Sequence, residues 1–212
     1  NFNLSKKINL KKFKDFFLKF VFNNMNFLFF YPTIKQINKL YWYFNKFDQY
    51  FSNNLIDFKD YYFFHKNFNN FYNVYKENGF LSFQIIFPED SVLSIKRFIK
   101  FLTQNNIYST LSGIKKMCSD DFLISFQGDG LSISIDLPIT KLNKKDIKKN
   151  SDFIYNKVLD LDGKINLTKD SFLTNKIFKK MYKNYDKFWE IKEKIDPSLT
   201  FSNQKAKELF NF

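Results

Sequence analysis

The sequence predicts an α+β fold: an antiparallel sheet with helices mainly on one face, of the ferredoxin-like type, followed by a helical C-terminal tail. Two patterns predict it. Apolar and polar residues alternate in residues 80–88 and 131–139, as they do in strands with one buried face. Between these segments and after them, apolar residues recur at helical spacing. Because such helices cover the apolar side of a sheet, we expect its polar side to be free to line a ligand cavity.

Residues 1–78 precede the predicted sheet as a helical and aromatic lead-in whose fold the pattern does not define. Residues 5–30 combine apolar residues at helical spacing with lysines between them. We favour a helix packed on its own domain, but a basic helix resting on a membrane surface needs the same pattern.

The segment 79–162 carries the predicted sheet and its first helices. The strand FLSFQIIFP ends at Pro88, and Asp90 or Ser91 is placed to cap the next helix. Helical spacing returns over 144–161, and Gly163 supplies a stop signal. Further strand-like segments lie at 107–117, 122–127 and 131–139. The inner side of the first helix is expected to carry Val92, Ile95, Phe98, Ile99 and Leu102.

The segment 163–212 begins with a short predicted strand, KINLT, at residues 164–168. Helical runs follow at 172–183 and 185–194, and Pro197 separates them from the tail.

Composition narrows the function classes. Cys118 is the sole cysteine, so the sequence predicts neither a disulfide framework nor a metal cluster. The formal net charge of +13 would suit a nucleic-acid-binding protein. However, the basic residues are almost all lysines scattered along the chain, and Arg97 is the sole arginine, whereas nucleic-acid recognition relies heavily on arginine. We therefore expect no nucleic-acid partner.

The sequence also bears on location. The opening segment lacks the apolar stretch of a signal peptide, and no apolar run reaches the ~18 residues of a spanning helix. We expect a cytoplasmic protein that is soluble or makes a peripheral membrane contact.

Five motifs carry a family resemblance. In chain order they are GFLSFQIIFP, STLSGIKKM, LISFQGDGLSISIDLP, GKINLTKDSFL and MYKNYDKFWEIKEKIDPSLTFSNQKAKEL, spread from Gly79 to Leu209. In order and spacing they resemble GFxQYQFVxP, SFLxVxKxF, LSFPxPGWxxxxDFP, GGRLYxAKDSRL and MYPRxDEFxxxRxxxDPxxxFxSDxxRRL of the decaprenylphosphoryl-ribose oxidase family. This family is related to vanillyl-alcohol oxidase and the aldonolactone oxidases.

The resemblance implies part of a two-domain enzyme that oxidises a sugar hydroxyl by hydride transfer to FAD. Residues 79–162 would form the substrate (cap) domain, and residues 163–212 would pack on a flavin-binding domain or subunit. The five glycines of the chain form no glycine-rich, pyrophosphate-binding loop, so FAD would be bound mostly by a domain outside these 212 residues. The substrate would be a sugar or a lipid-linked sugar.

The resemblance also implies lysines in the site. Lys169 matches the lysine of the AKDS motif, which lies beside flavin and substrate in the family, and is the candidate catalytic and cofactor-binding residue. A lysine there could stabilise negative charge on the reduced flavin or orient the sugar. Lys115 matches a pocket lysine that could contact a substrate phosphate, with Lys116 as the competing register.

The remaining candidates would bind substrate. Gln84 matches the second glutamine of the QYQ strand, and Ser82 replaces the first. Ser134 stands where some members have a cysteine that covalent inhibitors attack, so we expect that reactivity to be absent here.

Together with Ser82, two further departures from the family pattern leave an alternative open. Leu131 replaces the tryptophan of the hairpin motif. His65 aligns with the histidine of an HPLD motif whose other residues are missing, so we interpret it as structural. The alternative is a non-catalytic binding or structural protein that keeps the fold without redox chemistry.

Overall fold

The computed structural model describes residues 31–51, 58, 75, 78–88, 90–139 and 143–212. The helix expected within residues 5–30 and the candidate His65 lie outside this part of the chain. The chain divides into two compact units, residues 1–79 and 80–212. In the first unit, the helix α2 (Tyr31–Phe51) exposes a run of aromatic side chains that includes Trp42 and Phe44.

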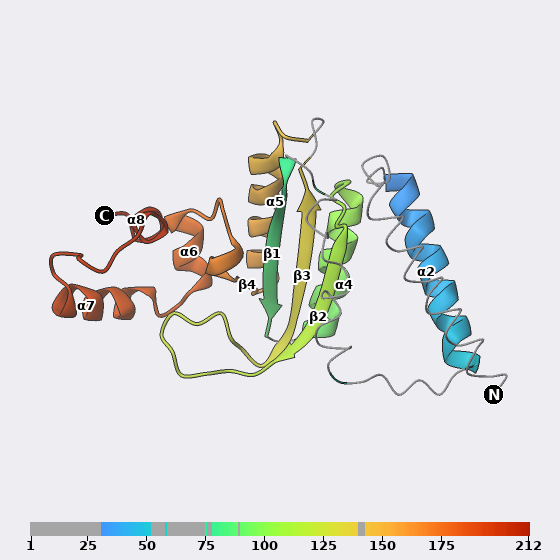
Figure 1. Cartoon of the computed structure of the whole chain (residues 1–212). Coiled ribbons are helices and arrows are strands. Elements are labelled where there is room, and N and C mark those ends of the chain that lie inside the picture. Colours follow the sequence, from blue (N-terminus) through green and yellow to red (C-terminus); the bar gives the residue numbers. More distant parts are fainter. Residues whose placement is uncertain (1–30, 52–57, 59–74, 76–77, 89, 140–142) are drawn as a thin grey trace. The chain divides into compact units, whose positions relative to one another are not determined.

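The second unit is built on a four-stranded sheet in which every neighbouring pair of strands is antiparallel (Figure 1). The order across the sheet is β2-β3-β1-β4. With a β-α-β-β-α-β connectivity, this order defines a ferredoxin-like α+β arrangement, and the predicted fold class is confirmed. The elements are β1 (Phe80–Phe87), α4 (Ser91–Gln104), β2 (Leu111–Met117), β3 (Gly130–Pro138), α5 (Ile147–Asp160) and β4 (Lys164–Ile165).

The helices α4 and α5 pack against one face of the sheet, where the main core lies (Figure 1). From β1, the ring of Phe87 meets Phe98 of α4 at 5.7 Å between centroids, and the ring of Phe83 meets Tyr155 of α5 at 6.0 Å. Ile85 lies between the two β1 phenylalanines and is fully buried. Each such side chain contributes roughly 1.5–3 kcal/mol by leaving water. The apolar half of the β1 alternation therefore fixes which face the helices cover.

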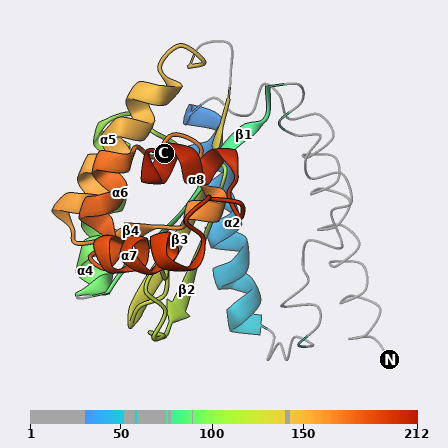
Figure 2. The same ribbon diagram turned by 90° about the vertical axis from the view of Figure 1, so that its left-hand side faces the viewer.

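The C-terminal segment adds a helical layer beside α5 and β4 (Figure 2). Phe178 is fully buried, and its ring contacts those of Tyr185 and Phe210. The Tyr182 hydroxyl donates to the Ile165 carbonyl of β4 at 2.7 Å, which ties this layer to the sheet. The layer consists of a 3-10 turn, η4 (Leu167–Lys169), and the helices α6 (Asn175–Met181), α7 (Tyr185–Ile195) and α8 (Gln204–Phe210).

The predicted strand at 122–127 is wrong, because these residues belong to the loop that joins β2 to β3. The carbonyls of Ser125 and Gln127 accept hydrogen bonds from Lys164 Nζ at 2.9 and 2.6 Å. The backbone of this loop is therefore bonded to a lysine side chain and pairs with none of the four strands of the sheet. Burial lowers the pKa of Lys164.

The predicted inner side of α4 is right for its centre and wrong at its margins. Phe98 is fully buried, whereas Val92 and Ile99 are 58% and 45% exposed. The helix is rotated so that Ser94 faces inward instead, at 7% exposure.

The start of α4 also differs from the prediction, since no side chain caps it. Asp90 adopts a left-handed backbone conformation and makes no capping hydrogen bond. The hydroxyl of Ser91 donates to the Phe87 carbonyl at 2.5 Å instead. Among the described residues, no helix combines the length and the apolar content that a membrane crossing requires.

Candidate functional site

The face of the sheet opposite α4 and α5 carries polar side chains, and the strand register determines which of them are neighbours. Ser82 of β1 pairs with Asp136 of β3, and Gln84 pairs with Ser134. Residues that pair across antiparallel strands project from the same face. We call this set the polar face: Ser82, Gln84, Ser132, Ser134, Asp136 and Lys115.

Lys115 joins the polar face from the edge strand β2. It pairs with Ser132, whereas Lys116 pairs with Leu131 and therefore projects from the face that carries α4. The two candidate lysines therefore lie on opposite faces of the sheet, and Lys115 is the one on the polar face. Lys115 is exposed.

The polar face is open at its centre. Gly113 of β2 pairs with Ser134, and a Cβ atom added at Gly113 would meet nothing within 4 Å. A glycine here leaves Ser134 without a side chain beside it on β2. No side chain of β2 therefore stands between a flat ligand and the backbone at this point.

One end of the face is covered by the loop between β2 and β3. Ile86 is fully buried although it shares a face with Gln84. At Gly128 of the loop, an added Cβ would stand 3.4 Å from the Ile86 Cδ1 atom, and Lys164 holds the same loop through two carbonyls. A ligand on the polar face would therefore lie over the Ser82 end of β1 and could reach the covered end only along the edge strand β2, where Lys115 is exposed.

Asp136 brings a carboxyl group to that end. Burial raises the pKa of Asp136, while a hydrogen bond from Ser82 and the charge of Lys169 act to lower it. The charge of Lys169 is thus close enough to act on Asp136, although the two residues belong to different elements. The sequence analysis did not select Asp136, but the polar alternation of Ser132, Ser134 and Asp136 was the signal that could have found it.

Lys169 reaches this end because η4 follows β4 without a break. The backbone N–H of Asn166 donates to the backbone carbonyl of Gln84 at 2.8 Å, and the backbone N–H of Lys169 donates to the backbone carbonyl of Asn166 at 3.1 Å. Lys169 is exposed, as a contact to a partner or ligand requires.

Asp170, the residue after Lys169, is held in place by several contacts of its side chain. Its carboxylate has no exposed surface and accepts from Tyr155 Oη at 2.5 Å, from the Leu173 amide at 2.8 Å and from Lys205 Nζ at 2.8 Å. Burial and the nearby Asp170 charge raise the pKa of Tyr155, so the phenol keeps the proton it donates. Asp170 thereby ties the turn that carries Lys169 to α5 and α8.

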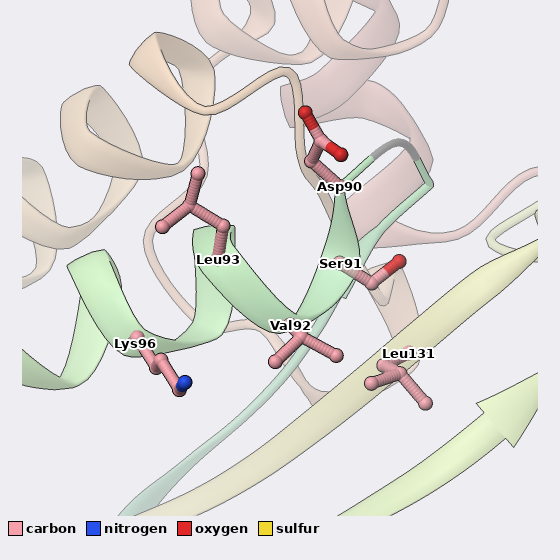
Figure 3. Close-up of a pocket in the computed structure, with 6 residues that line it drawn as sticks. All are labelled: Asp90, Ser91, Val92, Leu93, Lys96 and Leu131. Carbon is pink, nitrogen blue, oxygen red and sulfur yellow. The ribbon is translucent and has the colours of Figure 1, made fainter.

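A hollow of about 450 Å³ lies elsewhere, at the start of α4 (Figure 3). Asp90 and Leu93 lie on one side of the first turn, and Val92, Lys96 and Leu131 on the other. These side chains surround the end of a helix instead of converging on a point. We therefore place the candidate site on the polar face and not in this hollow.

Two comparisons with known proteins bear on what the chain is related to. No protein-family model matches the chain. The chain is similar to decaprenylphosphoryl-beta-D-ribose oxidase of Mycolicibacterium smegmatis, with 27% identity over 136 residues. The aligned part covers 64% of this chain and 29% of that protein, so the chain spans less than a third of the length of this relative. The similarity relates the chain distantly to FAD-dependent oxidases.

Proposed function

We propose that this chain is the substrate-binding part of an FAD-dependent oxidoreductase that oxidises a hydroxyl of a sugar or a polyprenyl-phosphate sugar. The observation that carries the proposal is the polar face, where strand pairing gathers Ser82, Gln84, Ser134 and Lys115. These residues were selected from separate motifs up to 52 positions apart in the sequence. The distant similarity to an oxidase of a lipid-linked sugar supports the same substrate class.

The two ends of the polar face suit different parts of such a substrate. Asp136 and Ser82 offer acceptors for sugar hydroxyl protons at the end near Lys169. Lys115 offers an exposed cation at the edge strand, where it would bind a substrate phosphate. Gln84 and Ser134 lie between them and would bind ring oxygens.

FAD would be bound mostly by a flavin-binding domain or subunit and would supply the hydride acceptor. Of the residues in this chain, Lys169 fits a contact with it, since it is an exposed cation on a turn held by Asn166 and Asp170. A fixed cation there would stabilise negative charge as it develops and would help to orient the sugar.

A surface at the end of α7 fits the flavin-binding partner. Ile195 and Phe201 are 78% and 84% exposed, yet Asp196 between them is buried. Its carboxylate accepts from the Thr200 and Phe201 amides at 2.8 and 3.0 Å and also bonds Lys192. We infer that these two exposed apolar side chains, held on a fixed turn, form part of the interface with that partner. A peripheral membrane contact remains the route by which a lipid-linked substrate would be reached.

The first test is the visible absorption spectrum of the protein purified from its native source, with its polypeptides resolved by mass. We expect bound flavin together with a second, glycine-rich segment, either on the same polypeptide or on a separate one. A chain of this mass without flavin, which still binds a short-chain prenyl-phosphoryl-β-D-ribose, would instead support the non-catalytic binding protein.

The second test addresses Lys169 in the flavin-containing protein. Lys169→Ala should lower turnover by about 10²-fold or more, the usual effect of losing a group that stabilises developing charge. The fold should be unchanged, because an exposed lysine rarely contributes much stability. Lys100→Ala, which changes an exposed lysine on α4, is the matched control. Turnover near that of the control would remove Lys169 from the site.

A further inference from the structure

A run of hydrogen bonds links the turn that carries Lys169 to the centre of the polar face. Thr168 donates its backbone N–H to Asn166 Oδ1 at 3.0 Å. Asn166 Nδ2 donates to Gln84 Oε1 at 2.9 Å. Gln84 Nε2 donates to Ser132 Oγ at 3.4 Å. The run connects η4, β1 and β3 through two side-chain amides.

The direction of this run follows from its first member. A backbone N–H can only donate, so the atom of Asn166 that faces Thr168 must be its oxygen. The Thr168 hydroxyl bonds the same oxygen at 2.8 Å. The Asn166 amide nitrogen therefore points to Gln84, which must present its own oxygen in return. The nitrogen of Gln84 is left facing the hydroxyl of Ser132, which is buried beside it.

We propose that Asn166 is a positioning residue that orients the Gln84 amide, so that the polar face offers an N–H donor to the ligand at this point. Gln84 has two N–H groups, and the buried Ser132 accepts from only one of them, at 3.4 Å, which leaves the second for a ligand on the half-buried side of Gln84. The amide thus selects for an acceptor, such as a sugar ring oxygen or a phosphoryl oxygen, at the centre of the face. This inference rests on the proposed function, because it takes the polar face as the substrate site.

Asn166 also couples the turn that carries Lys169 to the centre of the polar face. Its side chain caps η4 through the Thr168 amide, and its carbonyl accepts from the Lys169 amide at 3.1 Å. The same residue therefore holds the turn of Lys169 and the orientation of Gln84. Neither role is visible from the position of Asn166 in the sequence.

Two substitutions separate these roles. Asn166→Asp keeps an oxygen for the Thr168 amide but replaces the donor to Gln84 with a second acceptor. Asn166→Ser also keeps a capping oxygen, is too short to reach Gln84, and adds no charge. In the full chain, NMR of the side-chain amide groups should show that the Gln84 N–H signals shift in Asn166→Asp, because the amide turns its nitrogen to the new carboxylate. Unchanged Gln84 signals in both variants would overturn the orientation role.

The effect on ligand binding is measured with the short-chain prenyl-phosphoryl-β-D-ribose as probe. Asn166→Ser and Asn166→Asp should both weaken its binding by about 3- to 10-fold, as expected for a misdirected hydrogen bond. In a Gln84→Ala background, Asn166→Ser should have no further effect, since Asn166 acts through Gln84. Losses that multiply in the double variant would show an independent role and overturn the proposal.

The same series distinguishes failure of the inference from failure of the proposed function. If Gln84→Ala weakens the probe while both Asn166 variants bind it normally, the inference is wrong and the substrate face stands. If Gln84→Ala leaves the affinity unchanged, the substrate face is wrong, and the ligand part of the inference is overturned with it. The amide signals decide the orientation role in either case.

Discussion

At the scale of single residues, Asp136 links stability to the chemistry of the site. Burial raises its pKa, so the folded protein holds this proton to higher pH than the unfolded chain does. The stability gained by protonation is complete below the ordinary value of 3.8 and is lost as the pH rises through the folded-state pKa. Asp136 thus lowers the stability of the folded protein at neutral pH, and it lies at the end of the polar face where we place the sugar hydroxyls.

Asp136→Asn should therefore increase the free energy of unfolding at pH 7, and the gain should shrink as the pH falls toward 3.8. Urea unfolding at several pH values between 4 and 7 measures it. Asp129→Asn is the opposite case, because hydrogen bonds from Ser119 lower the pKa of Asp129. That variant should lose stability at pH 7 and recover toward the wild type in acid. A loss of stability at pH 7 in Asp136→Asn would contradict the argument.

Asp170 gives a second prediction at this scale. Asp170→Asn removes the charge that faces Lys205 and turns one acceptor into a donor inside a fully buried group. We expect a loss of about 2–4 kcal/mol in the free energy of unfolding, as for other broken buried ion pairs. Asp160→Asn is the control, since its pair with Lys157 is exposed and should be worth less than about 1 kcal/mol. Equal losses in the two variants would show that Asp170 does not hold the turn.

At the scale of elements, two glycines in neighbouring strands have opposite surroundings. A Cβ at Gly130 of β3 would stand 2.3 Å from the Phe87 carbonyl oxygen and 2.9 Å from Pro88 Cα, and neither is a side chain that can move aside. Gly113 of β2 has nothing within 4 Å. The close approach of β3 to the end of β1 thus requires glycine at position 130, whereas position 113 has room for a side chain.

Gly130→Ala should cost about 1–3 kcal/mol in thermal or urea unfolding, because the backbone must shift. Gly113→Ala should be neutral or stabilising by roughly 0.5 kcal/mol, since alanine loses less chain entropy than glycine on folding. Similar stabilities for the two variants would mean that β3 can move away from β1 without cost.

Elements with a clear period could be predicted from the sequence, and elements defined by their partners could not. The alternation of Phe83, Ile85 and Phe87 with Ser82 and Gln84 gave both the strand and its buried face. The segment 122–127 also has strand-like composition, but two of its carbonyls are bonded to the Lys164 side chain, and it pairs with none of the four strands. The orientation of α4 and the role of Asn166 likewise depend on contacts made by residues far away in the sequence.

At the scale of the whole molecule, the proposed partner surface predicts that a substitution at Phe201 weakens assembly but leaves the stability of the fold almost unchanged. Phe201→Ala should change the free energy of unfolding by less than about 0.5 kcal/mol, because the side chain is 84% exposed. It should weaken association with the proposed flavin-binding partner by roughly tenfold or more if Phe201 is an anchor of the interface. Ile99→Ala, on the exposed side of α4, is the control, and association is measured by calorimetry. Unchanged association in Phe201→Ala would remove this surface from the interface.

The sequence by itself determined the α+β class, the order of the main strands and helices, and a set of polar candidates that includes Gln84, Ser134 and Lys115. These properties follow from local periodicity and from motif residues, which a single chain displays directly. Only the tertiary structure decided which candidates are neighbours, that Lys115 and not Lys116 shares their face, and that Asp136 and Asn166 join them. Strand register and the packing of the C-terminal layer set these contacts, and both arise from pairings between distant segments that no local pattern specifies.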